Sequence, residues 1–108
     1  MKLTSLAILL TVAVMPGVVH AADATAGQKV FQMKCQPCHG DNGQGKEAIA
    51  KMFKVTMHPL ASTEVQSQTD EQLAKIITTG KGKMPPLKTL SKSEVSDVIA
   101  FVRTLGKK

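Results

Sequence analysis

The segment Cys35-Gln36-Pro37-Cys38-His39 constrains the fold of this chain more than any other feature. It contains the only two cysteines of the sequence, followed at once by a histidine. The pattern C-x-x-C-H is typical of a c-type haem attachment site. Two thiols at this spacing can add to the two vinyl groups on one edge of a porphyrin, and the adjacent imidazole then ligates the iron. The sequence therefore predicts one covalent haem c, held by Cys35 and Cys38 and ligated by His39.

Three other uses of the cysteines fit the sequence less well. A thioredoxin-like dithiol requires a βαβ context, and the sequence has no strand pattern. A structural zinc site requires four ligands, but the only histidines after His20 are His39 and His58. A disulfide across so short a loop would constrain little of the fold. We therefore favour haem attachment.

Residues 1–21 have the pattern of a secretory signal peptide. Lys2 gives a positive start, Leu3–Val14 is mostly apolar, and Pro16 interrupts the run before a short segment that ends at Ala21. We predict cleavage after Ala21, with cleavage after Ala22 as the alternative. A membrane-spanning helix requires about 20 apolar residues, so an uncleaved anchor is disfavoured. We expect a periplasmic protein whose mature chain has no stable membrane anchor.

Residues 22–108 are few enough for a single domain. The chain has three phenylalanines and neither tryptophan nor tyrosine, so a haem would have to supply much of the apolar core. The domain is basic, and Lys81, Lys83 and Lys88 cluster around Met84. Such a surface is either merely solvated or docks an acidic redox protein. Nucleic acid is excluded as a partner, because the chain is predicted to be exported and no aromatic residues are interleaved with the basic ones.

The rest of the domain reads as short helices and loops, so we predict an all-α fold. Helices are expected at 25–34, 47–55, 69–79 and 91–106. Three of them begin with capping-box patterns, in which a Ser or Thr is followed three residues later by Gln or Glu: Thr25 with Gln28, Thr69 with Gln72, and Ser91 with Glu94. The last helix has an amphipathic stripe made of Val95, Val98, Ile99, Val102 and Leu105.

The second axial position of the iron has several candidate ligands in the mature chain. Met33 is too close to the first cysteine to reach the opposite face, and Met52 belongs to an apolar helical stripe that is more typical of a core. Met84 lies in a loop far along the chain, followed by two prolines. We favour Met84; Met57, His58 and an iron without a sixth ligand remain as alternatives.

These motifs together resemble the class I c-type cytochromes, in particular the small bacterial monohaem proteins of the c6 and c5 types. The segment from Gly27 through Phe31 to the haem motif resembles the family's first helix. Thr79–Pro85 resembles the loop with the methionine ligand, and Ile99–Val102 resembles the last helix. The resemblance implies a cytochrome c fold, in which short helices wrap around one haem and the first and last helices cross.

The resemblance also implies roles for particular residues. Gly27 and Phe31 should meet Val98 and Phe101 at the helix crossing. Pro59 resembles the family proline whose carbonyl accepts a hydrogen bond from the histidine ligand. Such a partner fixes the imidazole ring and raises its basicity.

The function expected of such a chain is one-electron transfer and not catalysis. Ligation by His39 and Met84 would raise the reduction potential and saturate the iron. We expect a monomer that docks transiently on redox proteins, through a small interface. The alternative is a haem enzyme or sensor of a peroxidase-like kind, in which the methionine ligand is labile or absent.

Overall fold

The computed structural model describes Leu3 and residues 7–13 and 21–107. Much of the predicted signal peptide therefore lies outside the described residues. Within the described ranges, no helix is long and apolar enough to cross a bilayer.

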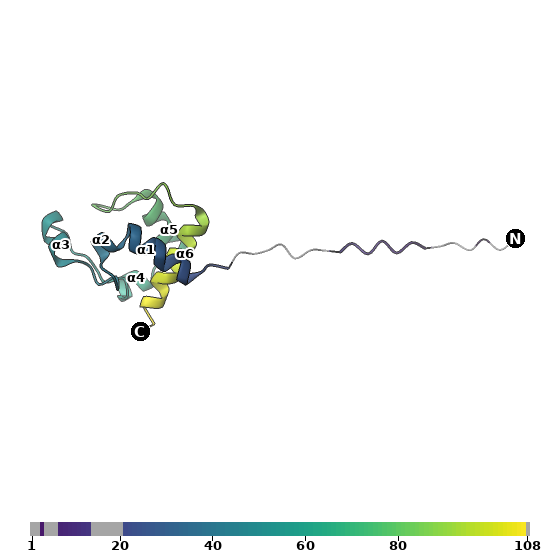
Figure 1. The fold of residues 1–108 in the computed structure, drawn as a ribbon, viewed down its shortest axis with the longest axis horizontal. Helices are drawn as coiled ribbons and strands as arrows, with labels where there is room; N and C mark the ends of the chain where they lie inside the picture. The colour runs from purple at the N-terminus through teal and green to yellow at the C-terminus, as the bar shows by residue number, and fades with distance from the viewer. Residues whose placement is uncertain (1–2, 4–6, 14–20, 108) are drawn as a thin grey trace.

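The described chain is helical, as predicted (Figure 1). The only β feature among the described residues is an isolated bridge between Lys81 and Met84. Two of the helices, at 36–39 and 63–66, are single turns that the sequence patterns did not predict. The helices are α1 (Ala24–Lys34), α2 (Gln36–His39), α3 (Glu47–Phe53), α4 (Thr63–Gln66), α5 (Asp70–Thr79) and α6 (Lys92–Leu105).

Side-chain caps set the first residues of three helices. The predicted capping boxes at α5 and α6 are confirmed, with Thr69 and Ser91 as the capping residues. The prediction for α1 was wrong, because its cap is Asp23 and not Thr25. The Asp23 carboxylate accepts bonds from the backbone N–H groups of Thr25 and Ala26, at 2.9 and 3.2 Å. An aspartate satisfies such free N–H groups at least as well as a threonine, so the helix starts earlier.

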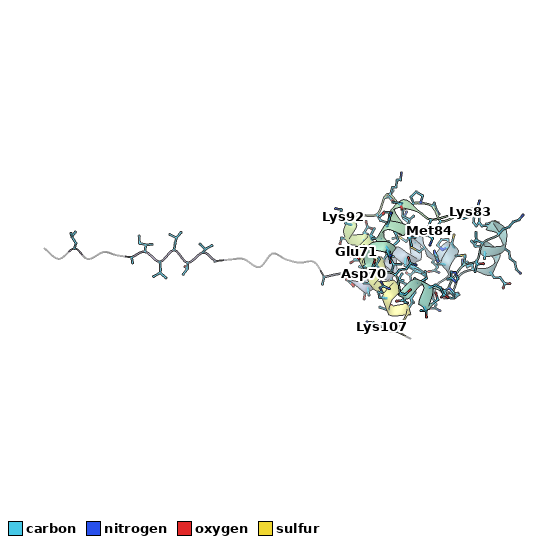
Figure 2. All side chains as sticks on the ribbon, turned by 180° about the vertical axis from the view of Figure 1, so that it is seen from behind. Asp70, Glu71, Lys83, Met84, Lys92 and Lys107 are labelled. Atoms are coloured by element: carbon cyan, nitrogen blue, oxygen red, sulfur yellow. The ribbon has the colours of Figure 1, made fainter. Side chains whose placement is uncertain are left out.

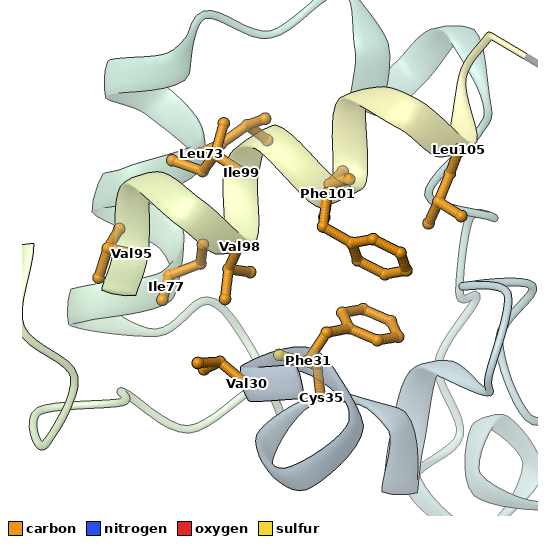
Figure 3. Close-up of a cluster of buried hydrophobic side chains, with 11 residues drawn as sticks. Val30, Phe31, Cys35, Leu73, Ile77, Val95, Val98, Ile99, Phe101 and Leu105 are labelled. Carbon is orange, nitrogen blue, oxygen red and sulfur yellow. The ribbon is translucent and has the colours of Figure 1, made fainter. Parts of the chain in front are cut away.

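The first and last helices cross at Gly27, as the family resemblance implies. A Cβ atom at this position would overlap the backbone carbonyl of Asp97. One turn further on, the rings of Phe31 and Phe101 lie 5.0 Å apart between centroids and are tilted by 55° (Figure 3). This separation is within the range of favourable aromatic pairs. Glycine therefore permits a close approach that brings the two rings together.

The core extends from this crossing along α6 to α5. Phe31 and Val98 are each only 1% exposed. All five residues of the predicted α6 stripe are buried, and Leu73 and Ile77 of α5 pack in the same cluster. One expectation failed: Met52 of α3 is 64% exposed and not part of the core. Helix α3 has no buried residue, so its apolar spacing did not indicate a buried face.

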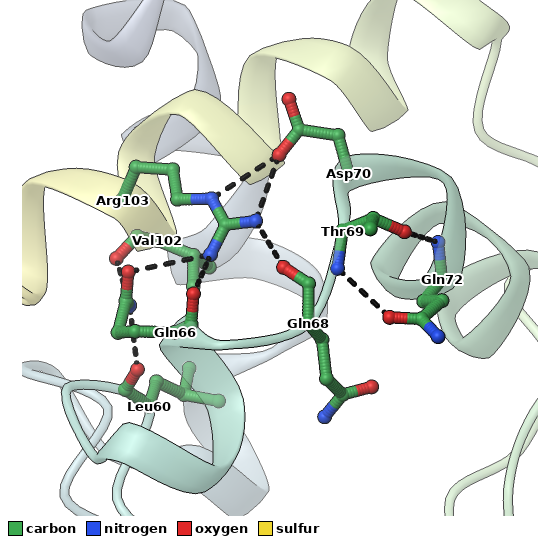
Figure 4. A network of polar contacts seen from close by, with 8 residues as sticks. All are labelled: Leu60, Gln66, Gln68, Thr69, Asp70, Gln72, Val102 and Arg103. Atoms are coloured by element: carbon green, nitrogen blue, oxygen red, sulfur yellow. Dashed lines mark hydrogen bonds and ion pairs between the residues drawn. The ribbon is translucent and has the colours of Figure 1, made fainter.

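A network around Arg103 joins α6 to the segment between α4 and α5 (Figure 4). The guanidinium donates to the backbone carbonyls of Gln66 and Gln68, at 2.9 and 2.5 Å. It also donates twice to one carboxylate oxygen of Asp70, at 3.1 and 2.9 Å. The side-chain amide of Gln66 also donates to the backbone carbonyls of Leu60 and Val102. These bonds fix a segment that contains little regular structure.

Replacing Arg103 with alanine is expected to lower the free energy of unfolding by about 2 kcal/mol, because it removes charge-assisted bonds to carbonyls. Asp70→Asn is the matched control, since the Asp70 side chain is largely exposed and an exposed ion pair contributes at most about 1 kcal/mol. Urea unfolding of both variants measures the difference. Equal losses would show that the ion pair, and not the carbonyl bonds, carries the effect.

Candidate haem site

The C-x-x-C-H motif occupies the junction between α1 and α2. Cys35 follows the last residue of α1 as its C-terminal cap, and its carbonyl accepts from the N–H of His39 at 2.9 Å in the turn of α2. Cys35 is 8% exposed, whereas Cys38 is exposed. Both thiols are free. The helical turn therefore presents two unpaired thiols and the imidazole from one short segment.

Burial shifts the pKa values of two side chains of the motif, Cys35 and His39. It raises the pKa of the Cys35 thiol to about 11, with a smaller contribution from the neighbouring Cys38. It also lowers the pKa of the His39 imidazole, because a buried site disfavours the charged form. The imidazole is thus held neutral, which is the form that binds a metal.

The loop after the motif folds back onto it. The N–H of Gly45 donates to the carbonyl of His39 at 2.6 Å, and the N–H of Lys46 donates to the carbonyl of Cys38 at 3.0 Å. Gly45 has a φ of 80°, a left-handed conformation that favours glycine. The fold-back places the following segment beside the motif, and the side chain of Met57 lies against Gly45.

Met84 is held by a tight turn after α5. Its backbone exchanges two bonds with Lys81, at 3.0 and 2.9 Å. Gly80 makes the turn possible, since a Cβ there would lie 2.7 Å from the carbonyl oxygen of Met84. The N–H of Leu87 donates to the carbonyl of Ile77 at 2.8 Å and ties the loop to α5. Lys83 is exposed, whereas Met84 is partly buried; both are labelled in Figure 2.

A cavity of about 480 Å³ brings the predicted site residues together. Cys35, Cys38, His39 and Met84 all line it. So do Met57 and His58, whereas Met33 and Met52 are not among the lining residues. The rest of the lining is mostly apolar and includes Ile49, Phe53, Leu73, Ile77, Val98 and Val102.

The cavity fits a haem in both shape and chemistry. An apolar space between helices suits a large apolar macrocycle, with a few polar groups to orient it. His39 Nδ1 is buried and has no hydrogen-bond partner among the described residues. An unpaired buried nitrogen is costly, and an imidazole that ligates a metal commonly donates its other N–H to a nearby acceptor. Cys35 and Cys38 would hold the haem covalently, and His39 would ligate its iron.

The structure does not contain the bond expected between His39 and Pro59. The carbonyl of Pro59 instead accepts from the N–H of Ser62 at 2.9 Å, in the turn that leads into α4. A carbonyl oxygen has two lone pairs, so this bond leaves room for a second donor. The role of Pro59 as acceptor for the imidazole stays a prediction.

Comparison with known proteins assigns the family. The family model described as cytochrome c oxidase, cbb3-type, subunit III matches residues 22–102. A cytochrome c6 of Leptolyngbya boryana is 38% identical over 82 residues, which cover 75% of this chain and 91% of that protein. The chain is a small class I c-type cytochrome.

Solved structures agree with this assignment. One c-type cytochrome superposes with a TM-score of 0.63 and 27% identity, covering 73% of this chain and 95% of its own. The cytochrome c6 of the diatom Phaeodactylum tricornutum superposes with a TM-score of 0.60 and 26% identity, covering 80% of this chain and 97% of the diatom protein. The predicted family and the predicted cytochrome c fold are both confirmed. Haem c is accordingly the cofactor of this cytochrome, and electron transport is its class of function.

Proposed function

We propose that this cytochrome is a one-electron carrier with a single haem c, joined to Cys35 and Cys38 and ligated by His39 and Met84. One observation supports the proposal above all: a single, mostly apolar cavity is lined by all four side chains. The haem supplies the one-electron couple, and the protein sets its potential through ligands, burial and hydrogen bonds.

Met84 is the better sixth ligand because of where its rivals lie. Gly45 is bonded to the carbonyl of His39, and Met57 packs against Gly45. Met57 therefore belongs to the His39 side of the site, while a second axial ligand must approach from the other face. His58 follows Met57 directly and is exposed. Met84 comes from a different element and packs, partly buried, against the core.

This ligand pair favours a carrier over an enzyme or a sensor. Thioether and imidazole together fill both axial positions and raise the potential of the iron. A relative that matches along 91% of its own length is a cytochrome c6, which favours a carrier made of one such domain. The peroxidase-like alternative requires a free or labile axial position.

Lysines at the mouth of the cavity fit an acidic redox partner. Lys34, Lys81 and Lys83 line the cavity, and Lys81 and Lys83 are exposed. Positive charges around a contact surface speed association with an acidic protein, in a way that salt screens. We propose transient docking of a monomer over this edge of the site, as small electron-transfer interfaces allow.

Export completes the proposed function. Residues 1–21 would direct the chain to the periplasm and be removed after Ala21, as their sequence pattern indicates. The mature cytochrome would then act outside the cytoplasm. A secreted protein that retains the leader, with a mass equal to that of the whole chain, would contradict this part of the proposal.

Haem attachment is tested by producing the full chain in cells with a working haem-attachment system. We expect one haem per chain, resistant to acid extraction, with the pyridine haemochrome spectrum of a haem bound through two thioethers. Cys35→Ala and Cys38→Ala should each give the spectrum of a single thioether, and the double variant should lose the haem on extraction. A pure, exported wild-type protein without covalent haem would overturn the proposal.

A further inference from the structure

Asp97 is a carboxylate in an apolar setting. It lies on α6 between Val95 and Val98, and it is 7% exposed. Its side chain accepts a hydrogen bond from the backbone N–H of Asp23, at 2.8 Å. A carboxylate can accept several bonds, and a buried charge is costly unless it is paired. Among the described residues, the ion pairs of the structure do not include Asp97. In the part of the chain that the structure describes, this carboxylate therefore has no cationic partner.

The chain next to Asp97 is where the predicted leader ends. Ala21, Ala22 and Asp23 are exposed and lie outside any helix, directly before the start of α1 (Figure 1). Hydrolysis of the peptide bond between Ala21 and Ala22 consumes one water. It leaves a carboxylate on Ala21 and a new α-ammonium group on Ala22. That ammonium arises one residue before the N–H group that already donates to Asp97.

We propose that Asp97 binds the α-ammonium group created by removal of the leader, and that this ion pair stabilises the crossing of α1 and α6. The inference rests on the proposed export and processing. The local charges agree with it. A positive charge near the N-terminus of a helix is unfavourable by itself, and α1 has no acidic residue in its first turn. Two carboxylates would offset the positive charge of the ammonium group. One belongs to Asp23, which caps α1, and the other to Asp97.

The pairing also explains why an acid occupies this position. The carbonyl of Asp97 lies against Gly27, so the residue belongs to the tightest contact of the fold. An apolar side chain there would suit the neighbouring core. The carboxylate accepts the N–H of Asp23, and a charged chain start beside it would also balance its negative charge, so that leader removal would strengthen the helix crossing.

The test compares haem-loaded mature protein, residues 22–108, with a free and with an acetylated N-terminus, each as wild type and as Asp97→Asn. Acetylation removes the charge and leaves the sequence unchanged. In the wild type we expect acetylation to raise the unfolding equilibrium constant about fivefold in urea, the upper end for a partly exposed ion pair. In Asp97→Asn, acetylation should no longer destabilise the protein, and it should stabilise slightly if the ammonium repels the start of α1. An acetylation effect of equal size in both backgrounds, or none in the wild type, would overturn the proposal.

A second measurement keeps the test valid if Asp97→Asn fails to fold. The titration of the α-amino group of Ala22, followed by NMR in the wild type, should give a pKa above the ordinary value of about 7.7 to 8.0. An ordinary value would contradict the ion pair. The haem spectrum and potential should be the same with either N-terminus. Failure of this inference would therefore leave haem binding intact, whereas failure of the proposed function would show as an altered or missing haem.

Discussion

Gly27→Ala is expected to destabilise the protein by about 3 kcal/mol or more, the upper range for an overpacked contact. The added methyl group would overlap the backbone carbonyl of Asp97, and its other near neighbours are also backbone atoms of α6. A side chain could rotate away, but the backbone of a helix cannot. The helices would have to separate, and the contact between the rings of Phe31 and Phe101 would loosen. Urea unfolding of the haem-loaded protein measures the loss.

A loss of stability in Gly27→Ala would identify the helix contact, because the opposite change is expected without that contact. Within a helix that packs on nothing, glycine to alanine stabilises by up to about 1 kcal/mol. Gln28→Ala is the matched control, because Gln28 is the next residue of α1 and is exposed. It should change stability little. A Gly27→Ala protein as stable as the wild type would show that the two helices do not touch at this residue.

Met84→Ala is expected to lower the reduction potential and to open one axial position of the iron. Loss of the thioether removes a soft, neutral ligand that favours the reduced state. The shift should be a sizeable part of the roughly 0.8 V that axial ligands can span. Potentiometric titration measures it, and the far-red absorption band of a methionine-ligated ferric haem should vanish.

Two controls separate ligation from a general disturbance of the site. Met57→Ala changes another methionine that lines the cavity, and Met52→Ala changes an exposed one. Both variants should keep the band and remain near the wild-type potential. If Met57→Ala abolished the band and Met84→Ala did not, Met57 would be the ligand.

The parts of the fold that follow from local patterns could be read from the sequence. The caps at Thr69 and Ser91 depend on residues three apart, and the α6 stripe depends on helical spacing, so both were predictable. The cap of α1 was misplaced because two neighbouring residues, Asp23 and Thr25, could each serve, and spacing does not rank them. Met52 was misjudged because α3 buries no residue, although its sequence has apolar spacing.

The site was predictable where its chemistry is contained in one segment. The roles of Cys35, Cys38 and His39 are predicted from their spacing, and all three line one cavity. Met84 was favoured from its loop position and the two prolines after it, but Met57 and His58 stayed open, because nothing local relates a loop after α5 to a motif after α1. The Arg103 network and the contact of Asp23 with Asp97 were missed altogether, since each joins residues more than 30 positions apart. Contacts of this kind depend on the assembled fold and leave no local sequence pattern.

Carbon monoxide added to the ferrous wild-type protein at neutral pH distinguishes a carrier ligated by His39 and Met84 from a haem protein with an open iron. Carbon monoxide binds ferrous haem only at a free axial position, so His39 and Met84 together should prevent its rapid binding. The Met84→Ala protein serves as the positive control and should bind one equivalent quickly. We expect an unchanged wild-type spectrum on the same timescale. Rapid, stoichiometric binding by the wild type would contradict it and favour a haem enzyme or sensor.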